Sequence, residues 1–179
     1  MNIASPSPIL DAELIWQPLA RVRPPEHLRS WLAERGSLTR RLQRYGRFTV
    51  RPLLQQVARP TAAEAILLGL PSRRVALIRE VVLLLDGQPV VFARSVLPLK
   101  SLTGANRVLG HMARRSLGAE LFKLPQASRR AVWAAQVPVS RLPLPVAEPC
   151  WGRQSLFVKR GKSLLVAEVF LPHLASLRP

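Results

Sequence analysis

The chain has 179 residues, of which 48% are hydrophobic, with 17 prolines against 9 glycines. This length allows one domain with a substantial core and is too short for two large ones. No apolar run approaches the roughly 20 residues of a membrane-spanning helix, and the first six residues lack the basic segment and apolar block of a signal peptide. The lone cysteine, Cys150, excludes an internal disulfide framework. We therefore expect a cytoplasmic protein without membrane insertion.

The formal net charge is +17, from 27 basic and 10 acidic side chains. Such a balance is compatible with nucleic-acid binding. However, the basic residues are scattered along the chain, and aromatic residues make up only 6% of it, too few for a stacking platform. We therefore expect an acidic small molecule as the ligand and no specific nucleic-acid partner.

Residues 1–24 are interrupted by prolines and are expected to form an extended N-terminal arm, anchored by Leu14-Ile15-Trp16. Two prolines open a predicted helix over residues 26–35, because proline is favoured in the first turn. A glycine ends that helix, and Ser37 is a good N-cap for a second helix over residues 38–45. The two helices resemble a DNA-binding helix-turn-helix in outline only.

The rest of the chain contains more strand than helix. Residues 48–58 alternate between apolar and polar types, as in a half-buried strand, and Thr61 and Glu64 have the spacing of a capping box for a short helix. Further along, the pattern predicts a helix over 104–115, a short helix or turn over 116–122, a strand over 128–137, a stiff proline-rich connection over 138–149, and strands over 154–159 and 163–171. Antiparallel strands with interspersed helices indicate an α+β domain.

The most regular segment is the predicted hairpin over residues 74–98. Its two β-rich runs flank Asp86-Gly87, which favours a two-residue turn because both residues tolerate positive φ. In that register Arg94 faces Arg79, and two directly opposed arginines should repel each other. The pair makes sense if it holds an anion; alternatively, one or both side chains extend to solvent. A four-residue loop would instead move Arg94 away from Arg79.

Glu168 lies in the last predicted strand, in a row of apolar residues spaced by two. Burying a carboxylate there without a partner would cost several kcal/mol. A two-residue turn at Arg160-Gly161 would place Arg153 directly opposite Glu168. The carboxylate is then either half of a structural cross-strand ion pair or a group held ready to accept a hydrogen bond or a proton.

Leu38 and Leu117 are of interest through their main chains. Each follows a serine at a predicted helix start, where amide groups are free and the helix dipole favours an anion. The three histidines are isolated, without the spacing of metal ligands, and no glycine-rich phosphate loop is present. We therefore expect no metal and no cofactor.

Several segments occur together and in order, and these carry a resemblance. They are Ser37-Leu38-Thr39-Arg40-Arg41-Leu42, Leu77-Ile78-Arg79-Glu80-Val81 with Asp86-Gly87-Gln88-Pro89, Ala93-Arg94-Ser95-Val96-Leu97-Pro98, Ser116-Leu117-Gly118, Trp151-Gly152-Arg153 and Glu168-Val169-Phe170-Leu171-Pro172. Together they resemble the bacterial chorismate lyases (chorismate–pyruvate lyases) over residues 31–172. The longer proline-rich segment before Trp151 departs from the family pattern.

The resemblance implies a single catalytic α+β domain, residues 25–179, in which helical flaps close over a buried site beside an antiparallel sheet. It implies that the substrate is bound by Arg79, Glu168 and the main chains of Leu38 and Leu117, with Arg79 and Glu168 as catalytic residues. Chorismate carries two carboxylates, so Arg94 is added to the expected anion donors.

The implied reaction converts chorismate to 4-hydroxybenzoate and pyruvate, which supplies the aromatic ring for ubiquinone synthesis. Glu168 would bind the ring hydroxyl; it either takes the ring proton or only orients the substrate while the proton moves directly to the enolpyruvyl group. The alternative function is a non-enzymatic sensor for aromatic acids, since ligand-binding domains of some transcription regulators share this fold. In either case we expect a monomer.

Overall fold

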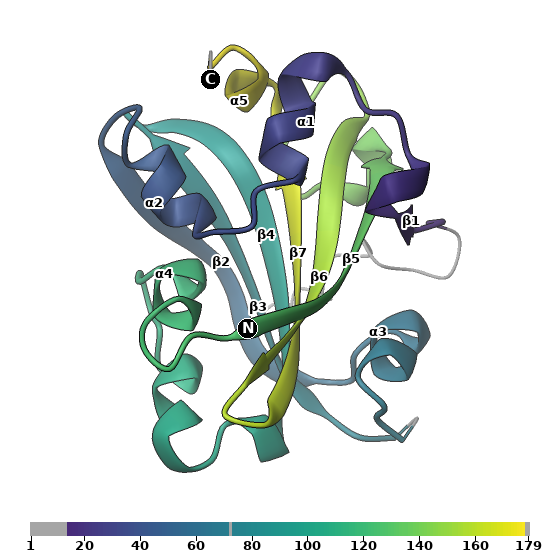
Figure 1. The fold of residues 1–179 in the computed structure, drawn as a ribbon, viewed down its shortest axis with the longest axis vertical. Coiled ribbons are helices and arrows are strands. Elements are labelled where there is room, and N and C mark those ends of the chain that lie inside the picture. Colours follow the sequence, from purple (N-terminus) through teal and green to yellow (C-terminus); the bar gives the residue numbers. More distant parts are fainter. Residues whose placement is uncertain (1–13, 72, 178–179) are drawn as a thin grey trace.

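The computed structural model describes residues 14–71 and 73–177. Seven antiparallel strands form one sheet in the order β1-β5-β6-β7-β4-β3-β2 (Figure 1). The strands are β1 (Gln17–Pro18), β2 (Phe48–Ala58), β3 (Ala76–Leu85), β4 (Gln88–Pro98), β5 (Ser128–Val137), β6 (Cys150–Lys159) and β7 (Lys162–Phe170). This arrangement confirms the predicted α+β class.

The helices between the strands are short. They are α1 (Glu26–Leu32), α2 (Leu38–Leu42), α3 (Ala62–Leu67), α4 (Leu117–Leu121) and α5 (Pro172–Ala175), with 3₁₀ turns η1 (Leu19–Arg21), η2 (Leu99–Ser101), η3 (Gly104–Gly110) and η4 (Val139–Arg141). Figure 1 shows α1, α2 and α4 in front of the sheet. Because none of these helices exceeds seven residues, packing on the sheet rather than helix propensity holds them.

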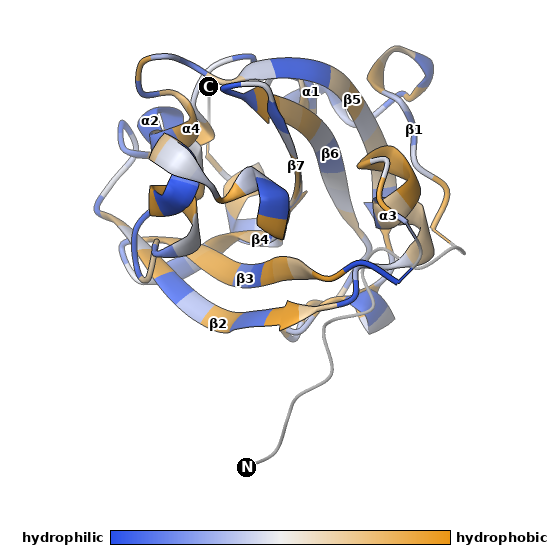
Figure 2. Ribbon diagram, turned by 90° about the horizontal axis from the view of Figure 1, so that it is seen from below, coloured by the Kyte–Doolittle hydropathy of each residue, from blue (hydrophilic) through white to orange (hydrophobic). Residues whose placement is uncertain are grey.

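Both faces of the central strands are buried, so β3 reads as an almost continuous apolar run, as its colours in Figure 2 illustrate. On one face, Val81 and Leu83 pack with residues of α1 and α2, and Leu77 packs with Leu117 of α4. On the opposite face, Ile78 packs beside Leu68, which follows α3. The polar residues of β3 are therefore enclosed on whichever face they occupy.

The β3–β4 hairpin has the predicted two-residue turn but not the predicted register. Asp86 and Gly87 both have positive φ, 48° and 82°, and Leu85 pairs with Gln88. The register then shifts by one residue within β4, at Val90. The expected pairing of Arg94 with Arg79 is therefore wrong: Arg94 lies opposite Glu80, and Ser95 lies opposite Arg79.

The β6–β7 hairpin has both the predicted turn and the predicted register. Arg160 and Gly161 occupy the turn with positive φ, and Lys159 pairs with Lys162. No register shift intervenes, so Arg153 pairs with Glu168. This confirms the cross-strand neighbours inferred from the sequence.

Other local predictions hold in part. The strand at 48–58 and the Thr61–Glu64 capping box are confirmed. The helix expected over 104–115 is instead the shorter turn η3, which buries Leu109.

The expected N-terminal arm is described only in part. Residues 1–13 lie outside the described part, and the remainder adds β1 to the sheet edge beside β5. In the predicted anchor, Leu14 and Trp16 pack on the core, whereas Ile15 is 75% exposed.

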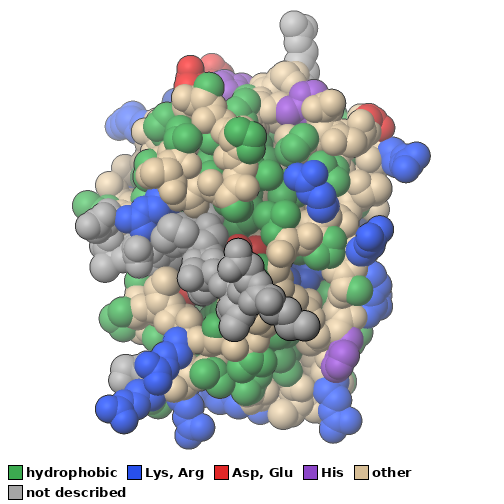
Figure 3. All heavy atoms as spheres, turned by 180° about the vertical axis from the view of Figure 1, so that it is seen from behind, with side chains coloured by type: hydrophobic (Ala, Val, Ile, Leu, Met, Phe, Trp, Pro, Cys, Tyr) green, Lys and Arg blue, Asp and Glu red, His purple; other side chains and the backbone are tan. Residues whose placement is uncertain are grey.

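Two further features are the distribution of surface charge and the length of the helices. Lys and Arg side chains lie around the rim of the face seen in Figure 3 and do not gather in a single patch there. No helix within the described ranges is long and apolar enough to cross a membrane.

Candidate active site

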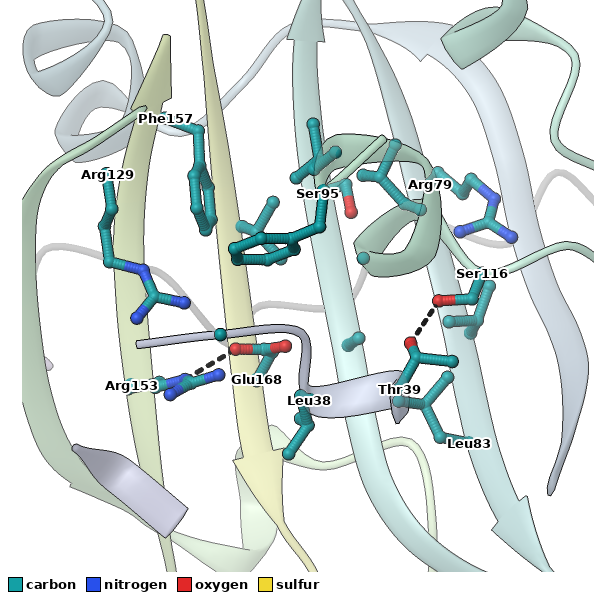
Figure 4. Close-up of a pocket in the computed structure, with 18 residues that line it drawn as sticks. Leu38, Thr39, Arg79, Leu83, Ser95, Ser116, Arg129, Arg153, Phe157 and Glu168 are labelled. Atoms are coloured by element: carbon teal, nitrogen blue, oxygen red, sulfur yellow. Dashed lines mark hydrogen bonds and ion pairs between the residues drawn. The ribbon is translucent and has the colours of Figure 1, made fainter. Parts of the chain in front are cut away.

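A pocket lies between the sheet and the flaps, the name used here for α2 and α4. Strands β3, β4, β5, β6 and β7 supply one wall and the flaps supply the other. The lining residues are Gly36, Leu38, Thr39, Arg79, Val81, Leu83, Ala93, Ser95, Ser116, Leu117, Gly118, Leu121, Phe122, Arg129, Arg153, Phe157, Val166 and Glu168. The surface of the pocket is largely apolar. Its charged side chains come from different strands, with Arg79 on one side of the pocket and Arg129, Arg153 and Glu168 on the other (Figure 4).

Arg79 enters the pocket from β3 and is held from behind by the chain that leads into α4. Its Nη2 donates to the carbonyls of Ala113 at 3.1 Å and Arg115 at 2.8 Å. Its buried Nε has no partner among the described residues. Burial lowers the pKa of Arg79 to about 10, so the site holds a guanidinium at an energetic cost that a bound anion would relieve.

Glu168 enters from β7 and is paired with Arg153 of β6. Arg153 Nε donates to Glu168 Oε2 at 2.6 Å, a short charge-assisted bond. The second carboxylate oxygen, Oε1, accepts no hydrogen bond within the described ranges. The ion pair and the available acceptor therefore coexist, so the two interpretations of Glu168 left open by the sequence are compatible.

Arg153 also fixes the end of α1. Its Nη1 donates to the carbonyls of Trp31, Leu32 and Glu34 at 3.1, 3.2 and 2.8 Å. A cation suits this position because the last carbonyls of a helix lack intrahelical donors. Fully buried Arg153 thus joins Glu168 to the segment that carries the chain into the first flap.

The two flaps are joined at their N-termini. The Oγ of Ser37 accepts from the amide of Arg40, and the Oγ of Ser116 accepts from the amide of Ala119, which confirms both predicted N-caps. The hydroxyls of Thr39 and Ser116 are hydrogen-bonded at 2.5 Å (Figure 4). The flaps therefore close over the pocket as a connected pair.

Leu38 and Leu117 occupy the first helical positions of the two flaps and line the pocket, as expected. A helix offers its first amides no internal acceptor. Gly118 lies at the contact between the flaps: a Cβ there would be 3.2 Å from Thr39 Oγ1 and 3.5 Å from Ser116 Oγ. The close approach of the flaps thus depends on a residue without a side chain.

Arg129 also lines the pocket, although it was not among the residues predicted from the sequence. It lies opposite Phe157, with its guanidinium 4.9 Å from the centre of that ring. The β5–β6 register shifts between Arg129 and Ala131, and such bulges re-aim side chains beside functional sites. Two adjacent arginines at the start of a predicted strand gave no indication of which one faces inward.

Arg94, by contrast, lies outside the pocket, which corrects its expected role as an anion donor. On the opposite face of the sheet its Nε donates to Glu64 Oε1 at 2.8 Å and its Nη1 to Glu80 Oε1 at 2.7 Å. Burial alone would lower the pKa of Arg94, but the hydrogen bonds and charges of these two carboxylates outweigh it and raise the pKa. The ion pairs tie α3 to the hairpin.

The charges of the pocket lining do not cancel. Three guanidiniums, those of Arg79, Arg129 and Arg153, face one carboxylate, that of Glu168. Desolvated guanidiniums bind carboxylates strongly and with defined geometry. The arrangement therefore suits a small, partly apolar ligand with two negative charges.

Other chemistries have little support in the described part of the chain. No group of three or more His, Cys, Asp or Glu side chains is placed there to hold a metal ion. Burial and Glu148 raise the pKa of the Cys150 thiol, which disfavours the nucleophilic thiolate.

Solved structures with a similar fold include a possible transcriptional regulator, YydK from Bacillus subtilis, with a TM-score of 0.53 at 15% identity, covering 74% of this chain and 60% of that one. PhnF from Mycobacterium smegmatis superposes with a TM-score of 0.58 at 16% identity, covering 79% of this chain and 66% of that one. The effector domain of PhnF gives a TM-score of 0.57 at 17% identity, covering 77% and 90%. At this identity the likeness concerns the fold alone.

Sequence relatives are much closer. A probable chorismate pyruvate-lyase from Alcanivorax borkumensis is 54% identical over 92% of this chain and 79% of its own length. Another, from Aromatoleum aromaticum, is 43% identical over 88% and 91%. The model of the family described as chorismate lyase matches residues 10–177. The chain therefore belongs to the chorismate lyase family.

Proposed function

We propose that the protein is a carbon–oxygen lyase that converts chorismate to 4-hydroxybenzoate and pyruvate. One observation carries this proposal: the buried, largely apolar pocket is lined by three guanidiniums and one carboxylate, which leaves a net charge of two positive units. Chorismate has the complementary chemistry, because it is a dianion with an apolar ring and a ring hydroxyl. Family membership supports the same substrate.

In this proposal the ring carboxylate of chorismate binds at the Arg79 end of the pocket. The unpartnered Nε of Arg79 and the amides of Leu38 and Leu117 are the donors, as the resemblance to chorismate lyases implies. Carbonyl contacts from Ala113 and Arg115 hold the guanidinium before substrate arrives. Little reorganisation is then needed on binding, which favours affinity.

Glu168 accepts a hydrogen bond from the ring hydroxyl at the other end. Its Oε1 serves as the acceptor, since Oε2 is engaged by Arg153. The hydrogen bond from Arg153 fixes the position of the carboxylate, which favours a role for Glu168 in orienting the substrate. Orienting the hydroxyl also fixes C4, the ring carbon that bears it and that loses its hydrogen in the reaction.

The reaction needs no added atoms. The bond between ring carbon C3 and the ether oxygen breaks, C4 loses its proton, and the methylene carbon of the enolpyruvyl group gains one to become the methyl group of pyruvate. Aromatisation of the ring supplies most of the driving force. The protein contributes orientation and electrostatic stabilisation in a closed site, and no cofactor is required.

The remaining expectations stand as parts of this proposal. Residues 25–179 form one catalytic domain, active as a monomer in the cytoplasm. The 4-hydroxybenzoate formed there supplies ubiquinone synthesis. No specific nucleic-acid partner takes part.

Ultraviolet absorbance of a dilute protein sample mixed with excess chorismate tests the proposal. We expect many equivalents of chorismate to be converted, with equal yields of 4-hydroxybenzoate and pyruvate. A sensor of the same fold would bind chorismate without consuming it. Binding with no conversion by a folded sample would therefore reject the lyase in favour of the sensor.

A further inference from the structure

Arg129 has binding capacity that the protein itself does not use. Its Nη1 donates to the Glu34 carbonyl at 2.5 Å. Its buried Nε has no partner among the described residues, and no hydrogen bond from Nη2 is found within them. The part-buried side chain lines the pocket and stands over the face of Phe157, which orients the guanidinium without occupying its donors.

The surroundings of Arg129 favour an anion beside it. Arg153 donates to the same Glu34 carbonyl at 2.8 Å, so two guanidiniums converge on one neutral acceptor. Burial, followed by repulsion from Arg153, lowers the pKa of Arg129 to about 10, and the opposing charges of Glu168 and Glu34 do not offset this. The one lining carboxylate, Glu168, is hydrogen-bonded to Arg153. A purely structural arginine has no need of this crowding, and a carboxylate from outside would relieve it.

The position of Arg129 separates it from the ring-carboxylate end. Arg79 lies on β3, Glu168 on β7 and Arg129 on β5, so two strand-to-strand steps separate Glu168 from each arginine. At about 4.8 Å per step, each gap is roughly 10 Å before the side chains reach inward. Figure 4 shows Arg79 on one side of the pocket and Arg129, Arg153 and Glu168 on the other.

We infer that Arg129 binds the enolpyruvyl carboxylate of chorismate and thereby distinguishes substrate from product. This inference rests on the proposed function. With the ring carboxylate at Arg79 and the C4 hydroxyl at Glu168, the ether on the neighbouring ring carbon projects toward β5 and β6. Its carboxylate meets the free donors of Arg129. The product 4-hydroxybenzoate lacks this carboxylate, so Arg129 holds the substrate and not the aromatic product.

The test compares two unreactive ligands, 4-hydroxybenzoate and 3-(carboxymethoxy)-4-hydroxybenzoate, which carries a carboxylate where chorismate has the enolpyruvyl one. Dissociation constants are measured by calorimetry for the parent and for Arg129→Met. We expect the variant to bind the dicarboxylate about 10- to 100-fold more weakly than the parent does, as for a lost charge-assisted contact. Its affinity for 4-hydroxybenzoate should change less than threefold, roughly 0.7 kcal/mol.

Three further variants sharpen the comparison. Arg130→Met removes the exposed neighbouring charge and should leave both constants unchanged. Arg79→Met should weaken the binding of both ligands, because both carry the ring carboxylate. Arg129→Lys keeps the charge without the planar fork and should recover part of the dicarboxylate affinity; it also provides the measurement if Arg129→Met does not fold.

An Arg129→Met protein that keeps the parent's preference for the dicarboxylate would overturn the inference. An equal loss of affinity for both ligands would also overturn it, because it would indicate that Arg129 acts only structurally, through its contact with Glu34. Chorismate turnover by the parent is recorded in the same series. If the parent leaves chorismate unchanged, the proposed function fails, and the two dissociation constants still decide whether Arg129 recognises a second carboxylate.

Discussion

Arg79 combines a fixed geometry with free donors, and its replacement should be costly. Arg79→Ala removes a buried charge-assisted contact and leaves a substrate carboxylate without its partner, so we expect a loss of about 2–5 kcal/mol in the transition-state stabilisation read from kcat/KM. Arg79→Lys should recover little, because an ammonium does not reproduce the planar contact. Steady-state kinetics on both variants measures this. Near-parental kcat/KM for the lysine variant would mean that only the charge matters.

Glu168 has a structural partner and a proposed substrate contact, and one substitution separates the two roles. Glu168→Gln keeps the shape but removes the charge, so turnover should fall by at least about tenfold. Affinity for 4-hydroxybenzoate should fall less if the carboxylate acts mainly in the transition state. Thermal melting must accompany the kinetics, since the variant also weakens the contact with Arg153. A variant that melts like the parent and keeps full turnover would leave Glu168 with a structural role alone.

The sequence correctly predicted which residues face each other across β6 and β7, but not across β3 and β4, because only the second pair contains a register shift. Glu168 and Arg153 were placed opposite each other correctly because no irregularity separates them from the Arg160-Gly161 turn. Arg94 was misplaced because the one-residue shift near Val90 sends every later side chain of β4 to the other face. An apolar run such as that of β4 carries no alternation from which the shift could be read.

At the scale of elements, the contact between the flaps is the feature most open to test. Gly118→Ala would place a Cβ 3.2 Å from Thr39 Oγ1, so the flaps must separate slightly. We expect chorismate KM to rise about tenfold, equivalent to roughly 1.4 kcal/mol of lost closure, although alanine favours the helix itself.

Gly110→Ala is the matched control, because its added Cβ would meet Leu102 Cδ1 at an ordinary 3.6 Å. Its KM should stay at the parental value. If Gly118→Ala also keeps the parental KM and melting temperature, the close approach of α2 and α4 does not govern substrate binding.

The starts of the flaps could be predicted from short-range sequence signals, whereas the lengths of their helices depend on long-range packing. Ser37, Thr61 and Ser116 were recognised as N-caps because a hydroxyl near free amides is a short-range signal. The expected helix at 38–45 ends instead at Leu42. The bulge that orients Arg129 also depends on pairing with another strand, so this lining residue could not be identified from the local sequence pattern.

At the scale of the whole molecule, the net charge of +17 should act as a diffuse field. Basic side chains around the rim (Figure 3) predict weak, sequence-independent binding to DNA that declines steeply with salt. Fluorescence anisotropy with unrelated duplexes at rising salt measures this. Retention of one sequence over others at physiological salt would contradict the small-molecule function proposed for the protein.

We expect the guanidiniums, amides and one carboxylate of this chain to suffice for the cleavage of chorismate. The most direct measurement is the conversion of chorismate by protein that has been exhaustively treated with a chelator, with 4-hydroxybenzoate and pyruvate both quantified. We expect undiminished turnover and equal yields of the two products. No conversion by the folded protein, or activity that returns only when zinc or magnesium is added, would contradict it.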